Sequence, residues 1–415
     1  MSEVMTKAQL AKSASSALGQ LTADQKNKAL LLMADSLQKE YESIIEANKH
    51  DLEQGRSNGT PSSLLDRLAL DRERIDGIAD GLREIVALPD PIGEELELFE
   101  RPNGLRIAKR RVPIGTIGII YEARPNVTVD AAGLCLKTGN AVVLRGGSAA
   151  LHSNDRIVQV LKQAMAQSDM PLDALQLIND PDRASVDEML KLNGVLDVII
   201  PRGGASLIQN VVKNASIPVI ETGAGICHTF IDESAQVRMA ESIAINAKAQ
   251  RPSVCNAMET LLVHERYASI HLTSLAEQFK NMNVEIRGCQ KTKALLTWVK
   301  DATEEDFATE YNDYVLNMKI VASLDEALEH IARYGTKHSE CIVTEKAEHA
   351  ARFMSEVDAS SVYHNASTRF TDGFEFGYGA EIGISTQKLH ARGPMGLPAL
   401  TSTKFYIYGE GQIRG

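Results

Sequence analysis

Apolar residues recur at three- and four-residue steps through the first 87 residues of the chain. Between residues 30 and 45, Leu, Met, Tyr and Ile side chains follow this spacing, with charged residues between them. Such a period is typical of an amphipathic helix. Residues 64–86 repeat the pattern, and a turn-forming segment, 55–61, separates the two stretches. We therefore predict that residues 5–87 are helical.

The pattern changes to alternation between residues 95 and 112, on both sides of Pro102-Asn103-Gly104. Alternation that flanks Asn-Gly is a strong signal for a β-hairpin, because both residues tolerate the positive φ of a two-residue turn. A lone hairpin is only marginally stable in water. We therefore expect the hairpin at 95–112 to be stabilised by contact with another part of the structure, such as a second subunit.

From residue 113, short apolar runs alternate with stretches of helical pattern. The runs lie at 114–121, 141–144, 174–178, 196–200 and 218–220. Apolar strands that alternate with helices are typical of parallel βαβ units, whose sheet is buried on both faces. Ligands of such sheets collect at the carboxyl ends of the strands. Four loops rich in charge or glycine lie at those ends, at 122–126, 145–148, 201–204 and 221–225.

A second alternating region extends from about residue 227 to 385, with apolar runs at 260–263, 320–321 and 341–343. Residues 370–400 are rich in glycine and proline and are predicted to form extended loop. Residues 403–408 then form a short predicted strand. The pattern as a whole indicates an α/β protein, and 415 residues are enough for two or three domains.

The charge balance excludes several classes of protein. Lys and Arg number 44 and Asp and Glu 55, a net charge of −11, which argues against a general nucleic-acid or anionic-membrane binder. Local basic pockets for a phosphorylated small molecule stay open. The five cysteines are scattered without a CxxC pair, so we predict neither a disulfide framework nor a metal site. Without an export signal or a run of about 20 apolar residues, we expect a cytoplasmic protein.

Two strand ends carry an arginine followed by two glycines, Arg145-Gly146-Gly147-Ser148 and Arg202-Gly203-Gly204. Backbone N–H groups of such glycines can approach a phosphate, Ser148 can cap the next helix, and an arginine offers a bidentate fork. The alternative is a strand-to-helix turn with an exposed arginine, and neither GxGxxG nor GxxxxGK[ST] is present. Two such loops on one sheet edge favour a dinucleotide.

Cys255 is the candidate nucleophile, because it lies in a polar loop close to Arg251. A nearby cation supplies the thiolate character that a nucleophilic cysteine needs. Cys135 and Cys341 lie in apolar runs and are predicted to be inert. Cys227-His228 suggests a thiol hydrolase, but neighbours on a strand point to opposite faces, so we predict that these two side chains do not touch.

The order of these motifs resembles the aldehyde dehydrogenase superfamily and, within it, the gamma-glutamyl phosphate reductase family. The resemblance covers essentially the whole chain and rests on YEARPNVT, VLRGGS, IPRGG, ETGAGICH, QRPSVCNAMET, EYNDY, YGTKHSECIVT and HARGPMGL. It implies two doubly wound parallel α/β domains and a small β oligomerisation element. The implied NADP(H)-binding domain is 1–94 with 113–222, and the implied catalytic domain is 223–389. The implied oligomerisation element is 95–112 with 400–412.

The resemblance also implies the reaction. It is the reduction of L-glutamyl 5-phosphate by NADPH to L-glutamate 5-semialdehyde and inorganic phosphate, a step of proline biosynthesis, through a thioester on Cys255. A homo-oligomer, dimer or tetramer, is implied, and a glutamate 5-kinase is the implied partner that supplies the substrate.

Residue roles follow from the same resemblance. Cys255 is the implied nucleophile, Asn126 is an oxyanion donor beside the Cys255 N–H, and Glu221 is a site residue without an assigned role. Arg145 is placed like the residue beside the 2′-phosphate of NADPH. The other implied cofactor residues are Gly146, Gly147, Ser148, Arg202, Gly203, Gly204, Thr222, Gly223 and Glu310. Arg124, Arg251 and Arg392 are the implied substrate cations.

Three alternatives stay open from the sequence. The first is a hydrolytic NAD(P)-dependent aldehyde dehydrogenase of a small aldehyde. The second is a thiol hydrolase or acyltransferase that pairs Cys255 with His228, although it would not use the two Arg-Gly-Gly loops. The third is a non-catalytic scaffold, which the presence of Cys255, Asn126 and Glu221 disfavours.

Overall fold

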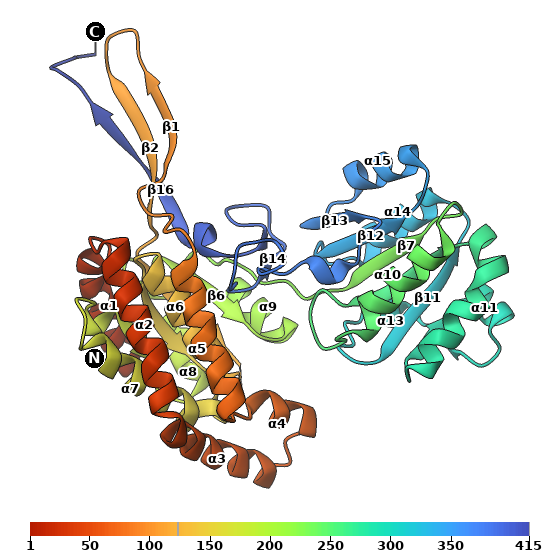
Figure 1. Ribbon diagram of the computed structural model, residues 1–415, viewed down its shortest axis with the longest axis horizontal. Coiled ribbons are helices and arrows are strands. Elements are labelled where there is room, and N and C mark those ends of the chain that lie inside the picture. Colours follow the sequence, from red (N-terminus) through yellow and green to blue (C-terminus); the bar gives the residue numbers. More distant parts are fainter. Residues whose placement is uncertain (123, 415) are drawn as a thin grey trace. The chain divides into compact units, whose positions relative to one another are not determined.

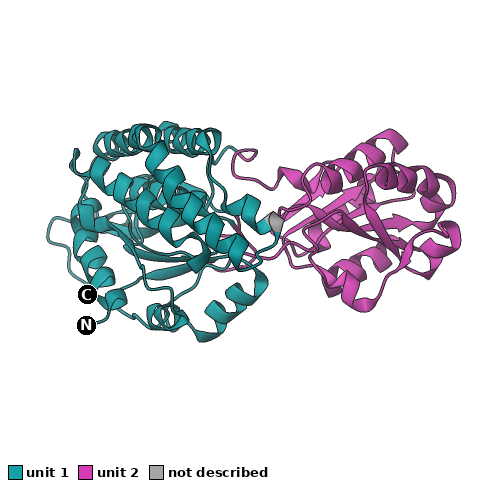
Figure 2. Cartoon of the chain, turned by 90° about the horizontal axis from the view of Figure 1, so that it is seen from below, with its two compact units in different colours: residues 1–221, 377–383, 395–415 teal, residues 222–376, 384–394 magenta. Residues whose placement is uncertain are grey.

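The computed structural model of the protein describes residues 1–122 and 124–414. The chain forms two compact units, shown in two colours in Figure 2. Unit 1 contains residues 1–221, 377–383 and 395–415, and unit 2 contains residues 222–376 and 384–394. The tail therefore alternates between the units before it ends in unit 1.

The predicted helical region, 5–87, is helical, but as five helices rather than two long stretches. They are α1 (Glu3–Leu18), α2 (Ala23–Lys39), α3 (Tyr41–Ser57), α4 (Ser62–Leu68) and α5 (Arg72–Ala87). Side-chain caps explain the additional starts: Thr22 forms a capping box with Gln25 at α2, and Asp71 accepts the Arg74 N–H at α5. The apolar faces of α2 and α5 pack on each other and into the core.

Unit 1 is built on a parallel sheet of four strands in the order β5-β4-β3-β6. The strands are β3 (Thr116–Tyr121), β4 (Ala141–Arg145), β5 (Leu175–Leu177) and β6 (Val198–Arg202). The connecting helices are α6 (Pro125–Lys137), α7 (Leu151–Met165) and α8 (Arg183–Met189), and α9 (Ala205–Asn214) follows β6. Every residue of β3 and β4 is buried, as predicted for a sheet covered on both faces. The predicted strand at 218–220 is reduced to one bridge, Ile199 to Val219, beside β6.

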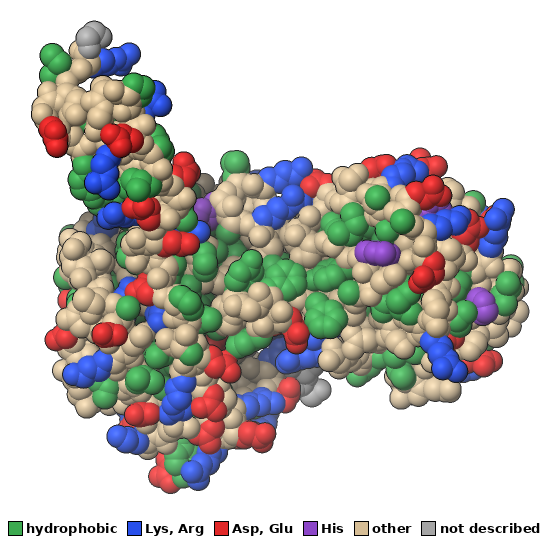
Figure 3. All heavy atoms as spheres, turned by 45° about the horizontal axis from the view of Figure 1, so that its top comes forward, with side chains coloured by type: hydrophobic (Ala, Val, Ile, Leu, Met, Phe, Trp, Pro, Cys, Tyr) green, Lys and Arg blue, Asp and Glu red, His purple; other side chains and the backbone are tan. Residues whose placement is uncertain are grey.

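The predicted hairpin is confirmed: β1 (Glu95–Glu100) pairs antiparallel with β2 (Arg106–Pro113). Its turn has three residues instead of two, because Gly104 alone takes a positive φ of 83°, and Asn103 does not. The support for the hairpin comes from its own chain, since β16 (Thr401–Tyr408) pairs antiparallel with the whole of β2. The three-stranded sheet stands out from unit 1 in Figure 1 and carries ion-paired charges of both signs in Figure 3.

Unit 2 contains a parallel sheet of seven strands in the order β10-β9-β11-β8-β7-β12-β13. Its strands are β7 (Cys227–Ile231), β8 (Met258–His264), β9 (Glu285–Gly288), β10 (Lys300–Asp301), β11 (Val315–Val321), β12 (Ser339–Val343) and β13 (Ser361–His364). Its helices are α10 (Val237–Ala249), α11 (Glu265–Asn281), α12 (Gln290–Leu295), α13 (Glu304–Phe307), α14 (Leu324–Tyr334) and α15 (Ala347–Glu356).

Both faces of this sheet are covered. Ile231 and Leu261 pack in a core with α10 and α11, whereas their strand neighbours Phe230 and Leu262 pack in a second core with α14 and α15. Residues 370–400 are largely loop, as predicted, with a short two-stranded sheet, β14 (Ile384–Ser385) and β15 (Gly393–Pro394). Among the described residues, no helix has the length and apolar character needed to cross a membrane.

Candidate active site

Cys255 lies in a turn that leads into β8. The N–H of Ala257 donates to the carbonyl of Val254 at 3.0 Å, so Cys255 occupies a central position of this turn. Its side chain is half-buried, whereas Asn256 beside it is buried. Because every strand pair in this sheet is parallel, the turn lies at the edge formed by the amino ends of the strands. In unit 1, by contrast, the loops that carry predicted site residues follow the carboxyl ends of β3, β4 and β6.

Gly225 joins the Cys255 turn to Glu310. A Cβ atom at Gly225 would lie 1.5 Å from the carbonyl oxygen of Cys255, far inside van der Waals contact. The N–H of the same glycine donates to Glu310 Oε1 at 2.8 Å. Gly225 precedes β7 and Glu310 precedes β11, the strands on either side of β8, so loops from three adjacent strand starts meet here. The sequence contained this glycine in the ETGAGICH motif, but only the backbone contact reveals why a side chain cannot stand there.

A buried ion pair supports the Glu310 loop from below. Lys248 Nζ on α10 lies 2.7 Å from Glu259 Oε2 on β8, and both side chains are almost fully buried. The other oxygen of Glu259 accepts the N–H of Asn312 at 3.1 Å. Burial raises the pKa of Glu259 to about 7, and burial lowers the pKa of Lys248. Sequence reasoning missed this pair, because a lysine and a glutamate 11 residues apart carry no signal of contact.

Cys227 and His228 have separate partners, as predicted. Cys227 Sγ donates to the carbonyl of Cys255 at 3.2 Å and lies 3.7 Å from His338 Nδ1. Burial raises the pKa of Cys227 well above its usual range, so this thiol is a neutral donor. The His228 ring instead pairs with Glu340 at 3.0 Å, and both are buried. The Cys255–His228 arrangement of a thiol hydrolase therefore receives no support.

Arg369 is a cation at the Cys255 turn that sequence reasoning missed. It belongs to the short helix η3 (Thr368–Phe370), and its Nη1 donates to Asn256 Oδ1. The Asn256 amide in turn donates to the carbonyls of Arg369 and Thr371 at 3.2 and 2.9 Å. Thr368 Oγ1 also donates to the Asn256 carbonyl at 2.8 Å. Nothing in the sequence placed η3 next to Cys255, because more than 100 residues separate them and the contact is tertiary.

The three predicted substrate arginines lie in different surroundings. Arg251 is exposed, four residues before Cys255. Arg392 donates to Asp358 Oδ1 at 2.7 Å, and Lys388 lies 2.9 Å from the other oxygen. These contacts, with that of Lys388 first, lower the pKa of Asp358. Arg124 belongs to unit 1, where it precedes α6. The structure therefore does not gather these arginines into one cluster within a single unit.

In unit 1 the predicted site residues lie at the carboxyl ends of β3, β4 and β6. The strand order reverses between β3 and β6, a topological switch point at which open α/β sheets bind ligands. The loops 122–126 and 202–204 leave the sheet on either side of this point. Ala123, inside the first loop, lies outside the described residues.

Asn126 is exposed in the first turn of α6. Its Nδ2 donates to Asp130 Oδ2 at 3.1 Å, one helical turn further on. Burial raises the pKa of Asp130 to about 6, against the opposing effects of Asn126 and Arg202. One of the two amide hydrogens of Asn126 is thus engaged, which fixes the direction of the other. The predicted oxyanion donor therefore has a defined orientation in unit 1.

The Arg202-Gly203-Gly204 loop opens α9, with Gly204 as its N-cap. The Gly204 N–H donates to Glu122 Oε2 at 3.1 Å, and the N–H of Glu122 donates to the carbonyl of Arg202. A carboxylate thus already lies on the helix N-terminus where the sequence predicts a pyrophosphate. Helix N-termini favour anions of either kind, so the residues present fit a dinucleotide phosphate.

Arg145, which is predicted to lie beside the 2′-phosphate, is bound by the protein itself. The side chain is 7% exposed, and its Nη atoms donate to the carbonyls of Gly146, Pro181 and Asp182 at 2.8 to 3.1 Å. Its Nε lies 3.3 Å from Ser185 Oγ. Burial lowers the pKa of this guanidinium, against the attraction of nearby Asp180 and Asp182. The geometry favours the alternative of a strand-to-helix turn. The arginine of this turn is buried, not exposed, and it stabilises the turn through its hydrogen bonds to backbone carbonyls.

The two positions after Arg145 are occupied by glycine for different reasons. A Cβ at Gly146 would lie 2.3 Å from Asn154 Nδ2 and 3.0 Å from the Tyr121 ring, so this glycine permits close packing. Gly147 is the N-cap of the short helix η1 (Ser148–Ala150), and Ser148 makes no cap hydrogen bond. The prediction of Ser148 as the cap is therefore wrong, because the helical turn begins at Ser148 itself. Ser148 is exposed at the strand edge.

The Glu221-Thr222-Gly223 segment crosses the boundary between the two units. Glu221 is half-buried at the end of unit 1, and Thr222 is buried at the start of unit 2. The N–H of Gly223 donates to the carbonyl of Ile384 at 2.9 Å, and a Cβ there would meet Thr386 at 2.3 Å. The segment is thus held against β14 by its backbone.

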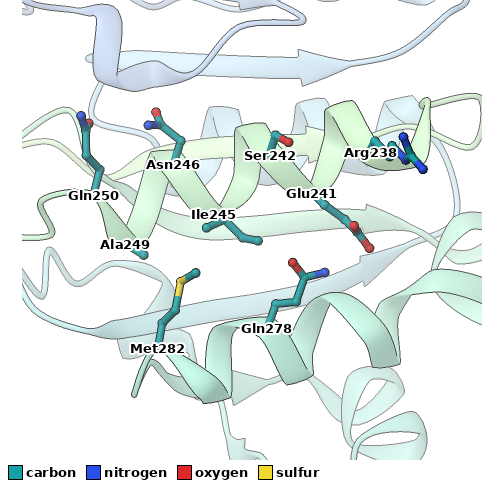
Figure 4. A pocket seen from close by; sticks show the side chains of 9 residues that line it. All are labelled: Arg238, Glu241, Ser242, Ile245, Asn246, Ala249, Gln250, Gln278 and Met282. Carbon is teal, nitrogen blue, oxygen red and sulfur yellow. The ribbon is translucent and has the colours of Figure 1, made fainter.

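A groove of about 620 Å³ lies between α10 and α11 on the outside of unit 2 (Figure 4). Its lining includes Glu241, Asn246, Gln250 and Gln278 with the apolar Ile245 and Met282. None of the predicted site residues lines it. Within the described residues it is linked to the Cys255 turn through Gln250, whose Oε1 accepts from Arg369 Nε at 3.1 Å. The groove is therefore distinct in its lining from the loops that carry the predicted chemistry.

The chain belongs to the aldehyde dehydrogenase family, whose family model matches residues 2–295. The parallel sheets are those of this fold: an acetylating aldehyde dehydrogenase from Geobacillus thermoglucosidasius is 17% identical but superposes with a TM-score of 0.71 over 100% of this chain and 98% of that one.

Within the family, the similar proteins are gamma-glutamyl phosphate reductases. The enzyme of Moorella thermoacetica is 58% identical over 412 residues, 99% of both chains, and that of Halalkalibacterium halodurans is 57% identical over 415 residues, 100% of both. The crystal structure of the Thermotoga maritima gamma-glutamyl phosphate reductase is 48% identical and superposes with a TM-score of 0.97 over 100% of both chains.

Proposed function

We propose that the protein reduces L-glutamyl 5-phosphate to L-glutamate 5-semialdehyde and inorganic phosphate with NADPH. The observation that carries the proposal is full-length identity of 57 to 58% with relatives that bear the name gamma-glutamyl phosphate reductase. The half-buried thiol of Cys255 in a turn beside Arg369 suits thiolate attack. The reaction belongs to proline biosynthesis, in the cytoplasm, where cysteine thiols stay reduced.

The chemistry begins at Cys255. Its thiolate attacks the acyl carbon, the carbon–sulfur bond forms, and phosphate leaves with the electrons of the carbon–oxygen bond. NADPH, when bound, supplies the hydride that reduces the resulting thioester. The thiohemiacetal on Cys255 then collapses, which breaks the carbon–sulfur bond, frees the aldehyde and restores the thiolate.

Both tetrahedral stages place negative charge on the former carbonyl oxygen. We assign its stabilisation to Asn126 Nδ2 and the backbone N–H of Cys255, by analogy with the family. The Asn126–Asp130 hydrogen bond supports this role, because it leaves one N–H of an exposed amide in a fixed direction. Asn126 belongs to unit 1 and Cys255 to unit 2.

The cofactor is assigned to the switch point of unit 1 and the Glu310 loop of unit 2. Gly203 and Gly204 at the start of α9 would hold the pyrophosphate, in exchange for the Glu122 carboxylate. Gly147 and Ser148 are exposed or half-buried at the neighbouring strand end. Glu310 is assigned to the nicotinamide ribose, with Thr222 and Gly223 beside the nicotinamide. Arg145 and Gly146 shape the loop from inside, and Glu221 is kept as a site residue without a stated role.

The three-stranded sheet is assigned to oligomerisation. Its two edge strands, β1 and β16, expose apolar side chains: Leu98, Phe99, Phe405, Ile407 and Tyr408. Exposed apolar side chains along an open sheet edge are typical of an interaction surface. We propose a homo-oligomer formed through this sheet, and a glutamate 5-kinase as the source of the acyl phosphate.

The decisive assay is the reverse reaction with purified protein. We expect NADPH formation from glutamate semialdehyde and NADP to require inorganic phosphate, to saturate with it, and to stop after about one turnover per active site without it, because water must be excluded from the thioester. Arsenate should replace phosphate, since an acyl arsenate hydrolyses spontaneously. Steady turnover in phosphate-free buffer would instead identify a hydrolytic aldehyde dehydrogenase.

A further inference from the structure

Two guanidinium groups flank the Cys255 turn without a carboxylate partner. Arg251 precedes the turn in sequence, and Arg369 is hydrogen-bonded to Asn256 within it. Neither arginine forms an ion pair within residues 1–122 and 124–414. Other arginines of unit 2, such as Arg266 and Arg352, do pair with carboxylates. The fold thus brings unpaired positive charge to the nucleophile.

Arg369 is held in a fixed orientation. Its Nη1 donates to Asn256 Oδ1 and its Nε donates to Gln250 Oε1, so the plane of the guanidinium is set by two amide oxygens. No hydrogen bond of its Nη2 occurs in the described part of the chain. Both oxygens that orient the group are neutral. The group is therefore anchored, and it forms no ion pair with a carboxylate in the described part of the chain.

The electrostatic surroundings of Arg369 also favour the binding of an anion. Burial lowers the pKa of Arg369, and the like charge of Arg251 lowers it further. The opposing charge is that of Asp372, whose Oδ1 is engaged by the N–H of Phe374. Bringing two cations together in a partly buried place costs free energy unless an anion joins them.

We propose that Arg369, together with Arg251, binds the phosphoryl group of the acyl phosphate and receives it as phosphate when it leaves. The proposal rests on the proposed function and assigns one of its substrate groups. When the Cys255 sulfur bonds to the acyl carbon, the departing oxygen keeps the bonding electrons, and the two guanidiniums stabilise that added charge. In reverse, they hold phosphate for attack on the thioester.

The other candidate cations do not offer the same arrangement. Arg392 already donates to Asp358, which Lys388 also contacts. Arg124 belongs to the other unit and stands two residues before Asn126. Arg369 is the described arginine whose hydrogen bonds tie it to the residue next to Cys255.

The test compares Arg369→Gln with the wild-type chain in the phosphate-dependent oxidation of glutamate semialdehyde. Glutamine removes the charge but keeps an amide donor for Asn256 Oδ1. A lost charged hydrogen bond of this kind raises a dissociation constant about 10- to 100-fold, so we expect the KM for phosphate to rise by that factor. The KM for semialdehyde should stay within about twofold, because its own contacts remain.

A second measurement needs no cofactor. Inorganic phosphate should slow the alkylation of Cys255 by iodoacetamide in the wild type, and this protection should be lost in Arg369→Gln and weakened in Arg251→Gln. Arg369→Lys should restore part of it, since lysine keeps the charge without the fork. The matched control is Arg266→Gln, at the carboxyl edge of the sheet and paired with Glu233, which should behave as wild type.

An unchanged KM for phosphate together with undiminished phosphate protection in Arg369→Gln overturns the proposal. So does a loss of protection that Arg266→Gln shares. If Arg369→Gln does not fold, Arg251→Gln and Arg369→Lys give the same decision. A wild type without any phosphate-dependent oxidation would overturn the proposed function instead, so the two failures are distinct.

Discussion

The two units hold their site loops in opposite ways. In unit 1 the loops leave the carboxyl ends of β3, β4 and β6, and the glycines at the start of α9 are exposed. In unit 2 the loops enter at the amino ends of β7, β8 and β11, and buried contacts tie them together through Gly225, Asn256 and Glu259. One edge offers backbone donors to a ligand, and the other fixes a thiol.

This difference suits the roles proposed for the two edges, in which unit 1 binds the cofactor and unit 2 carries the nucleophile. A cofactor that comes and goes with each turnover needs N–H groups that are reachable and only lightly occupied, as at Gly204. A nucleophile needs a position fixed to within a fraction of an ångström, because misplacement reduces the rate directly. The rigid edge should therefore be sensitive to small steric changes, and the open edge to changes in charge and hydrogen bonding.

The largest expected effect comes from Cys255→Ser. We expect reductase turnover to fall to background with NADPH affinity nearly unchanged, because a serine hydroxyl without an adjacent base is a poor nucleophile at neutral pH. Steady-state kinetics and fluorescence titration with NADPH measure the two effects. Cys289→Ser, at a half-buried thiol near Thr292, is the matched control and should retain activity. Comparable turnover by Cys255→Ser would remove this residue from the mechanism.

Asn126→Ala tests whether unit 1 takes part in the chemistry. Loss of one oxyanion donor typically lowers kcat about 10²- to 10³-fold. We expect that loss in kcat, with the KM for NADPH unchanged. Asp130→Asn should give a smaller loss, because its carboxylate only orients the amide. A normal kcat for Asn126→Ala would reduce Asn126 to a turn residue.

Gly225→Ala tests the rigidity of the other unit. The added Cβ would lie 1.5 Å from the Cys255 carbonyl oxygen, so the turn must move. A displacement of about 1 Å costs about 10²-fold in rate, and we expect kcat to fall by this order. Gly77→Ala is the control, since nothing lies within 4 Å of a Cβ there and alanine favours its helix. Wild-type kcat in Gly225→Ala would show that the Cys255 turn is pliable.

Arg145→Ala should affect stability rather than cofactor choice. Its guanidinium binds backbone carbonyls in a buried position, and each loss of a charged hydrogen bond costs about 1.5–3 kcal/mol. We expect a lower melting temperature and equal changes in NADPH and NADH affinity. Arg183→Ala, an exposed neighbour at the start of α8, is the control. A selective loss of NADPH affinity would restore the 2′-phosphate assignment.

The smallest expected effect concerns buried histidines of unit 2. Burial lowers the pKa of His330 to about 2 and that of His338 to about 4. Each of these histidines takes up a proton when the protein unfolds below about pH 6.5. The free energy of unfolding should therefore decrease as the pH falls, by about 1.4 kcal/mol per pH unit for each such histidine. His330→Leu should remove one proton from this slope, measured by urea unfolding between pH 7 and 5. An unchanged slope would show that His330 is protonated in the folded protein.

Much of the fold could be predicted from the sequence, because its signals are local. The helical period of 5–87, the alternation around Pro102-Asn103-Gly104 and the apolar runs of β3 and β4 each arise within one element. The prediction of a strand at 218–220 was wrong, because a short apolar run does not determine how many hydrogen bonds it forms with a neighbouring strand. The pairing of β16 with β2 joins residues almost 300 positions apart, for which no local signal exists.

The site was predictable only where a motif carried it. Cys255, Glu310 and the Arg202-Gly203-Gly204 loop stand in recognisable motifs. Arg369 and the Lys248–Glu259 pair could not be found, because their importance comes from tertiary contacts alone. Arg145 is the opposite case. A motif placed it correctly at a strand end, but the burial of its guanidinium indicates a structural role rather than a contact with the cofactor.

The path of the tail has a consequence for synthesis. Unit 2 is almost complete when residue 376 has been made, whereas unit 1 needs the last residues of the chain, since β16 pairs along the full length of β2. On the ribosome, β1 and β2 must therefore wait, with one ladder edge open, until nearly 300 further residues have been translated. Long-range pairing of this kind is slow and exposes an edge to wrong partners. The last strand to be synthesised is thus the one that closes the first hairpin.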